Sequence, residues 1–346
     1  MDGLRGVLAV YVMLGHALPF TCLPGWMAAP FRHGEAAVDL FFALSGLVIP
    51  YSLARFGGAF GPFMLARAKR LLPVYFPVLA AAIFITLLGN PLPAMPWARA
   101  GSLFWSPGLP PHALWHVLAH VLLVQGLIPQ NILPYAYVTL LGPAWSLSTE
   151  WQFYILIGLF ARSRTGGLAL ALLALAAAYH LLWPVGAWQF SRAFLPSAAA
   201  FFALGLASAM ALRGGGWAVF GACLAGACAL GAISGMGKAL VPLAWGVAML
   251  AQRQAWGTLL EHKTLQYLGA ISYPLYLVNE PVQRALALVL APLAHGNAGV
   301  FTLLWLPLAV AASLALAAAL HHGVERRFMR VNKKLLPKVI AAPAQG

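Results

Sequence analysis

Apolar stretches alternate with short polar segments along the whole chain, and several of them approach the length of a membrane crossing. In order they are Leu4–Phe20, Ala36–Leu53, Leu71–Leu88, Ala144–Ala161, Gly167–Trp183, Phe194–Leu212, Trp217–Ile233, Ala239–Ala251, Leu265–Leu290 and Val300–Leu320. A helix needs about 20 residues to cross the hydrocarbon core of a bilayer. The pattern therefore predicts an all-α fold, a polytopic membrane helix bundle of about ten transmembrane helices in one domain, residues 1–346.

One further apolar segment, His112–Ile128, is shorter, and counting it as a crossing would place Arg162, Arg164 and the basic tail outside the cell. We therefore predict a re-entrant or interfacial helix on the extracytoplasmic side, although the sequence leaves a crossing open. Three histidines share one face of it at intervals of four residues, His112, His116 and His120. That spacing could hold a metal ion. Because the segment has no carboxylate or Cys, we expect a polar face toward water and no metal site.

The chain is strongly basic, with 21 Lys and Arg against 7 Asp and Glu. Such an excess could indicate nucleic-acid binding. With a cytoplasmic N-terminus and ten crossings, however, 16 of the basic residues fall on the cytoplasmic side: Arg5, Arg55, Arg67, Lys69, Arg70, Arg162, Arg164, Arg213, Arg253, Lys263, Arg326, Arg327, Arg330, Lys333, Lys334 and Lys338. Membrane proteins show this asymmetry. The charge therefore indicates topology, with both termini cytoplasmic, a basic tail at about 323–346, and no nucleic-acid partner.

Acidic residues are rare, so those within apolar stretches are informative: Asp39, Glu150 and Glu280. A carboxylate inside the membrane normally faces a partner or a water-filled path. Counting from the nearest cytoplasmic Arg, His16 lies eleven residues deep, Ser45 ten and Glu150 twelve. At 1.5 Å per residue these depths are about 15–18 Å, near the middle of the hydrocarbon core. Three helices thus place a base, a hydroxyl and a carboxylate at one level.

This constellation suits general-base chemistry on a hydroxyl, with His16 as the base and Glu150 holding its imidazole. Ser45 and Asp39 join the set on the intervening helix. One alternative stays open, namely that His16 is a structural histidine and Glu150 a helix-packing residue. A proton-coupled transporter or permease is the alternative class, because intramembrane carboxylates and histidines also form proton relays. The sequence shows no internal repeat, which argues against a transporter.

A basic group lies in the predicted cytoplasmic run "FMLARAKRLLPVYFP". Arg67 and Arg70 are three residues apart and share a helix face, and Lys69 flanks them. Such a group can bind phosphates or anchor the protein to anionic headgroups. The residues alone favour anchoring.

Six segments, in order, resemble motifs of the acyltransferase 3 family of integral-membrane acyltransferases. "MDGLRGVLAVYVMLGH" is similar to the family's first helix, whose hallmark is an Arg and a His separated by ten residues, here Arg5 and His16. "AAVDLFFALSGLVI" resembles its second helix, "RAKRLLPVYFP" its basic cytoplasmic motif, and "AWSLSTEWQFYIL" its helix with Trp, Ser and Glu. "LGAISYPLYLVNEP" and "VERRF" resemble its late motifs. One departure is that the family usually has a His where this chain has Asn279 followed by Glu280.

The resemblance implies an acyltransferase that moves an acyl group, with acetyl expected, from cytoplasmic acyl-CoA to a hydroxyl of an extracytoplasmic glycan, glycolipid or related acceptor. It implies catalytic roles for His16, Glu150, Ser45 and Asp39. It implies acyl-CoA contacts by Arg5, Arg67, Lys69, Arg70, Trp145 and Ser146. Acyl-CoA would be a co-substrate, with no tightly bound cofactor. The expected partners are the lipid bilayer and a carbohydrate or lipid-linked acceptor, and the expected location is a bacterial inner (plasma) membrane. An acyl-enzyme intermediate and a homo-oligomer stay open.

Overall fold

The computed structural model describes residues 2–98, 105, 107–160, 165–183, 188–251 and 260–329, and every regular element within these ranges is a helix. The long helices are α1 (Asp2–Ala17), α3 (Gly34–Ala54), α4 (Phe60–Leu88), α6 (Ala144–Phe160), α7 (Thr165–Leu182), α8 (Leu195–Leu212), α9 (Trp217–Ser234), α10 (Met236–Ala251), α13 (Ser272–Leu293) and α14 (Ala298–Leu320). The short elements are η1 (Leu18–Phe20), α2 (Gly25–Ala28), η2 (Ala29–Phe31), η3 (Leu92–Ala94), α5 (Ala113–Val121), α12 (Lys263–Ala270) and the π-helical turn η4 (His321–Glu325).

The predicted all-α polytopic bundle is confirmed, since a long helix covers each of the ten predicted crossings. One boundary is corrected: the stretch Leu265–Leu290 is broken at Ile271 into α12 and α13. Seven helices of the described ranges are long and apolar enough to span a membrane. The exceptions include α6 and α10, which have 17 and 16 residues. The exact number of crossings and the side of the termini therefore stay predictions, and most of the basic tail lies outside the described residues.

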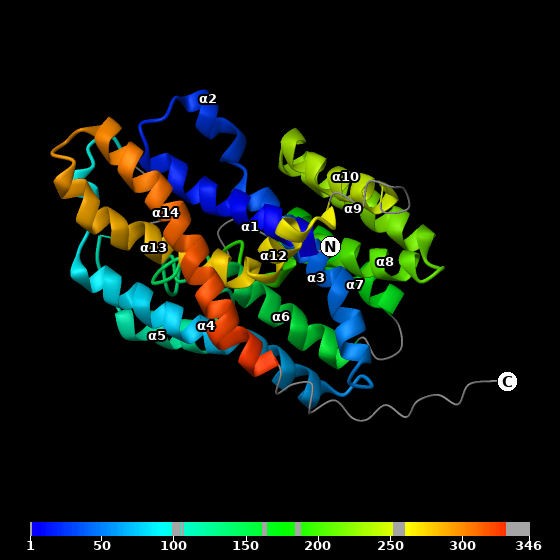
Figure 1. Cartoon of the computed structure of the whole chain (residues 1–346). Coiled ribbons are helices and arrows are strands. Elements are labelled where there is room, and N and C mark those ends of the chain that lie inside the picture. The colour runs from blue at the N-terminus through cyan, green and yellow to red at the C-terminus, as the bar shows by residue number, and fades with distance from the viewer. Residues whose placement is uncertain are drawn as a thin grey trace.

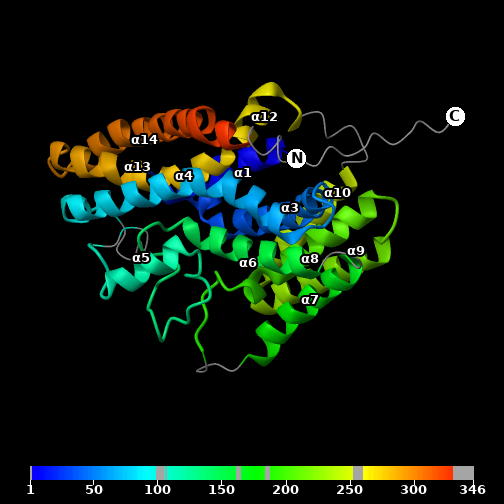
Figure 2. The same cartoon turned by 90° about the horizontal axis from the view of Figure 1, so that it is seen from below.

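The helices are arranged around α1 and α3 (Figures 1 and 2). In Figure 1, α13 and α14 lie on one side of α1, and α7, α8, α9 and α10 lie on the other. The chain packs α3 on α8, α13 on α14, and α1 on both α12 and α13. The core between these helices holds the intramembrane polar residues that the sequence singled out.

Glycines bring α3 and α8 into backbone contact. A Cβ atom at Gly205 would lie 2.1 Å from the carbonyl oxygen of Ala43, and one at Gly46 would lie 2.4 Å from that of Phe202. Small residues allow such close approach between membrane helices. The contact fixes the rotation of α3 about its axis and so determines which way Ser45 points.

The helix α5, which contains the three spaced histidines, has 9 residues. It is about 14 Å long and too short to cross a bilayer. The prediction of a polar face toward water is wrong for His116 and His120, which are buried. His116 Nδ1 lies 2.7 Å from the hydroxyl of Thr139, and the Tyr75 hydroxyl donates to the carbonyl oxygen of His120. The first histidine, His112, is exposed, and the other exposed side chains from residue 113 to 122 are apolar: Leu114, Trp115, Leu118, Val121 and Leu122.

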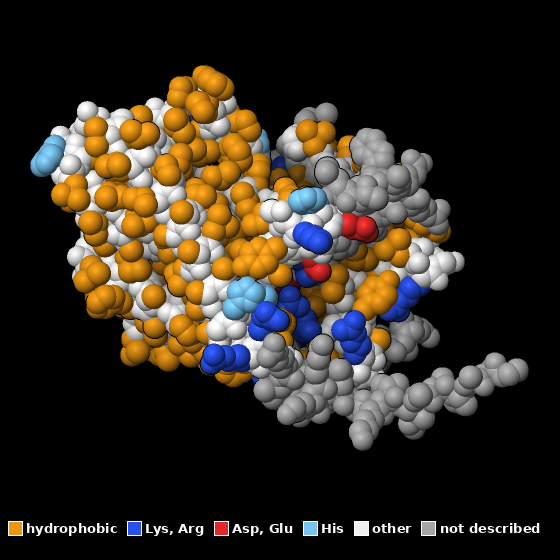
Figure 3. Space-filling model, viewed as in Figure 1, with side chains coloured by type: hydrophobic (Ala, Val, Ile, Leu, Met, Phe, Trp, Pro, Cys, Tyr) orange, Lys and Arg blue, Asp and Glu red, His pale blue; other side chains and the backbone are white. Residues whose placement is uncertain are grey.

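Charged and apolar side chains occupy different parts of the surface. On the face drawn in Figure 3, hydrophobic side chains cover the left-hand part, and Lys and Arg side chains gather near α12 and the lower end of α14. Membrane proteins concentrate Lys and Arg on the cytoplasmic side. This end of the bundle is therefore the one that we expect to face the cytoplasm.

Cysteine labelling tests this orientation, because Cys22 is exposed at the end predicted to be outside. In a background with Cys223→Ala and Cys228→Ala, a membrane-impermeant maleimide should label Cys22 in intact cells. A protein with Cys22→Ser and a new cysteine from Ala54→Cys, at the exposed end of α3, should react only after permeabilisation. Labelling of position 54 in intact cells would contradict the predicted topology.

Candidate active site

The intramembrane polar residues line two cavities that share one face of α3. The first, termed here the inner cavity, has a volume of about 100 Å³. Its lining from α3 recurs at the three- and four-residue intervals of one helix face: Val38, Phe41, Phe42, Ser45, Val48 and Ile49. Gly34, Glu35 and Val38 line a second cavity of about 260 Å³, the outer cavity. From Glu35 to Ile49 the helix rises about 21 Å. One helix face thus leads from the outer end of the bundle toward its basic end.

The inner cavity is lined by Arg5 from α1 and by Arg67 and Arg70 from α4. Arg67 Nη2 donates a hydrogen bond of 2.9 Å to the Ser52 hydroxyl. Arg70 Nε lies 3.9 Å from a carboxylate oxygen of Glu325, on η4. These contacts hold the guanidinium groups in place beside the cavity. The predicted pair Arg67 and Arg70 is therefore brought together with Arg5, whereas Lys69 is not among the lining residues.

Ser45 and Glu150 also line the inner cavity, and they contact each other. The Ser45 hydroxyl donates to Glu150 Oε1 at 2.5 Å, across 105 residues of sequence. The two helices α3 and α6 thus bring these groups to one level, as predicted from their depth. The pair places a hydroxyl and a carboxylate between the arginines and the far end of the cavity.

His16 lies on the other side, in the lining of the outer cavity. Its Nδ1 makes a hydrogen bond of 2.8 Å with Oδ1 of Asn279, on α13. The group that orients the imidazole is therefore Asn279, which corrects the prediction that Glu150 holds it. Sequence reasoning noted Asn279 only as a departure from the usual family residue and gave it no role.

The mouth of the outer cavity carries charged and aromatic groups. Arg192 forms an ion pair with Glu35, and its guanidinium lies 5.4 Å from the centre of the Trp145 ring. Sequence reasoning assigned no role to Arg192 or Glu35. Trp145, a predicted acyl-CoA contact, lines this outer cavity, whereas its neighbour Ser146 lines the inner one.

Asp39 and Glu280 are not among the residues that line either cavity. Asp39 follows Val38 and is turned about 100° from it around α3. The charges that act on Asp39 come from Glu35, Arg192 and Lys238. Glu280 is buried against Gly142, where a Cβ atom would lie 2.4 Å from its carboxylate. The structure thus does not bring either carboxylate together with His16 or Ser45.

Of the residues that the structure describes, two line both cavities, Val38 of α3 and Tyr276 of α13. The hydroxyl groups of Tyr276 and Ser146 are 2.9 Å apart, which fixes the tyrosine ring at this position. The two cavities are therefore neighbours, with Val38 and Tyr276 between the cationic groups of one and the histidine of the other. In the described part of the chain, no group of three or more His, Cys, Asp or Glu side chains could hold a metal ion.

Comparison with known proteins identifies the family. The sequence model of an acyltransferase domain, that of acyltransferase 3, matches residues 1–322. The chain belongs to the acyltransferase 3 family. It is similar to Protein 2 in picA locus of Rhizobium radiobacter, with 35% identity over 162 residues that cover 43% of this chain and 75% of the relative. No solved structure matches. The chain is thus a membrane acyltransferase, and the resemblance seen in its motifs is confirmed.

Proposed function

We propose that this membrane acyltransferase moves an acyl group, expected to be acetyl, from cytoplasmic acyl-CoA to a hydroxyl of an extracytoplasmic glycan, glycolipid or related acceptor. Its proposed location is the inner membrane of a bacterium. The observation that carries the proposal is that the two cavities are neighbours and share Val38 and Tyr276 in their linings. A donor entering one cavity and an acceptor entering the other would bring their reacting atoms together there.

The inner cavity suits the donor. Acyl-CoA carries its phosphates at one end and its thioester at the other end of a slim arm, and guanidinium groups bind phosphates through charge-assisted hydrogen bonds. Arg67 Nε is buried without a hydrogen-bond partner among the described residues, so this group has donor capacity for a ligand. From Ser45 to Val38 the wall of α3 rises about 10 Å. Ser45 and Glu150 would offer hydrogen-bonding oxygens to the amides of the arm along this path.

The outer cavity suits the acceptor. It is the larger of the two, about 260 Å³ against about 100 Å³, and a sugar ring is wider in cross-section than the slim arm that carries the thioester. Trp145 offers an aromatic face, and the Arg192–Glu35 pair offers hydrogen-bonding groups for hydroxyls. A carbohydrate or lipid-linked sugar is therefore the proposed acceptor class.

In the proposed transfer step, His16 takes the proton of the acceptor hydroxyl while its oxygen attacks the thioester carbonyl. A carbon–oxygen bond forms and the carbon–sulfur bond breaks, so that the CoA thiolate leaves into the inner cavity. The proton passes from the imidazole to the thiolate or to water, and the base is restored. This direct transfer needs no acyl-enzyme intermediate.

Labelled acetyl-CoA tests the proposal. Purified protein in lipid vesicles would receive acetyl-labelled acetyl-CoA and an extract of membrane glycolipids and polysaccharides as acceptor. We expect label on the acceptor, or released as acetate when acceptor is omitted, in excess of a heat-denatured control. Label retained on the protein would replace direct transfer with an acyl-enzyme route. Intact acetyl-CoA together with proton-dependent transport of a solute would support the transporter class instead.

A further inference from the structure

We propose that Asn279 is a positioning residue that holds the His16 imidazole in the tautomer with its proton on Nδ1, so that Nε2 is the atom that accepts the substrate proton. The inference rests on the proposed function, in which His16 is the base. It assigns a role at the position where the chain departs from the usual family residue.

The orientation of the Asn279 amide is fixed by its own helix. Its Nδ2 lies 3.2 Å from the carbonyl oxygen of Leu275 and 2.6 Å from that of Tyr276, and it donates to both. An amide nitrogen has two protons, and both are used in these bonds. A flipped amide would place Oδ1 against two carbonyl oxygens, which also only accept. The oxygen Oδ1 must therefore be the atom that faces His16.

The fixed amide then determines the tautomer of the ring. Oδ1 of an amide accepts hydrogen bonds and does not donate them, so Nδ1 of His16, 2.8 Å away, must carry the proton. In a neutral imidazole with its proton on Nδ1, the lone pair belongs to Nε2. Asn279 is fully buried, so its side chain is held by protein groups alone. A neutral partner thus provides the orientation that the sequence had led us to expect from a carboxylate.

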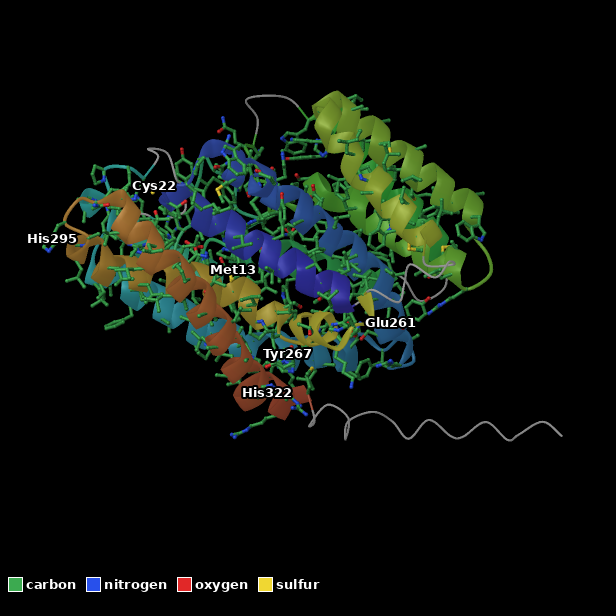
Figure 4. All side chains as sticks on the ribbon, turned by 45° about the horizontal axis from the view of Figure 1, so that its top comes forward. Met13, Cys22, Glu261, Tyr267, His295 and His322 are labelled. Atoms are coloured by element: carbon green, nitrogen blue, oxygen red, sulfur yellow. The ribbon has the colours of Figure 1, made fainter. Side chains whose placement is uncertain are left out.

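The same helix provides a matched control. Gln283 lies one turn beyond Asn279 on α13, and its Nε2 donates to the carbonyl oxygen of Met13 on α1 at 3.0 Å. Figure 4 shows Met13 between Cys22 at one end of the bundle and Tyr267 and His322 at the other. Both buried amides thus join α13 to α1. Only that of Asn279 contacts the imidazole.

Three variants separate positioning from packing. Asn279→Asp keeps an oxygen that can accept from Nδ1 but loses the donors to the helix. Asn279→Leu keeps the approximate shape and loses the acceptor. Gln283→Leu removes the other amide contact between the two helices. The measurements are kcat and KM for acetyl-CoA in the transferase or hydrolysis assay, together with thermal unfolding of each purified variant.

We expect Asn279→Leu to lower kcat on the order of 10–100-fold, the range known for partners that orient histidines in metal sites. Its KM for acetyl-CoA should stay that of the parent. Asn279→Asp should retain clearly more activity than Asn279→Leu, and Gln283→Leu should lower stability without lowering kcat. If Asn279→Leu fails to fold, Asn279→Ala tests the same loss of the acceptor in a smaller side chain.

Two results would overturn the inference. One is a kcat equal to that of the unsubstituted protein in a folded variant that lacks the hydrogen-bond acceptor at position 279. The other is an equal fall of kcat in Asn279→Asp and Asn279→Leu, which would assign the amide a purely structural role through its donors. His16→Gln distinguishes these outcomes from a failure of the proposed function. If only the role of Asn279 is wrong, His16→Gln is still inactive. If His16→Gln is active, the proposed base itself is wrong.

Discussion

His16→Gln should lose acyl transfer on the order of 10²–10⁴-fold while the protein still folds and still binds acyl-CoA. The glutamine amide can donate to Oδ1 of Asn279 as the imidazole does, so the polar contact on α13 is preserved. The glutamine amide cannot, however, accept a proton at neutral pH as the imidazole can. His16→Ala should be about as inactive for the same reason. The loss should appear in kcat, because the inner cavity that would hold the donor is lined by other residues.

A structural role for His16 predicts the opposite order of activities. The amide would then restore function, because it replaces the hydrogen bond of a buried ring, and only His16→Ala would be impaired. His180→Gln is a suitable control, because that exposed side chain contacts the carbonyl oxygen of Ser197, outside both cavities. Near-normal transferase activity in His16→Gln would dismiss His16 as the base and with it the proposed mechanism.

The helices themselves were predictable because the bilayer imposes a length and an apolar composition on every crossing. Depth was predictable for the same reason, since the positions of charged residues mark the ends of each helix. Ser45 and Glu150 illustrate this, because a residue count from the nearest arginine brought them to one level and they form a hydrogen bond. Depth alone, however, does not give the direction in which a side chain points.

Direction depends on the rotation of each helix, which tertiary packing decides. Successive residues of a helix are turned about 100° from each other, so Val38 and its neighbour Asp39 face different directions. The contact of Gly46 with α8 fixes the rotation of α3 in which Val38 lines both cavities and Asp39 lines neither. Trp145 and Ser146 likewise line different cavities although they are adjacent in sequence. A residue count along a helix gives the level of a side chain, and it cannot assign that side chain to one cavity or the other.

The histidines of α5 show a second limit. In a water-soluble protein a polar helix face points outward, and the prediction of a water-facing His116 and His120 followed that rule. In contact with lipid the preference reverses, because an exposed polar group would lose its hydrogen bonds. The structure buries both rings and leaves Trp115 and its apolar neighbours exposed. The pattern alone did not say which solvent the helix faces.

Replacing both Arg67 and Arg70 with Ala should weaken acyl-CoA binding on the order of 10²–10⁴-fold without unfolding the bundle. Each substitution removes a charge-assisted contact of roughly 1.5–3 kcal/mol, and about 1.4 kcal/mol corresponds to tenfold in affinity. Arg70→Lys should be tolerated only in part, since an ammonium group cannot reproduce a bidentate contact. Binding of labelled acetyl-CoA to the purified protein, measured at several salt concentrations, provides the comparison.

Arg55→Ala is the matched control, because it also removes a positive charge near the basic end but from an exposed residue outside the inner cavity. A general electrostatic effect of the basic surface would weaken binding similarly in this variant and in the double variant, and would fade with salt in both. A specific phosphate site would be lost in the double variant alone. Unchanged affinity for acyl-CoA in the double variant would mean that Arg67 and Arg70 anchor the protein to anionic headgroups, the role that the sequence pattern alone favoured. The inner cavity would then be without its proposed ligand.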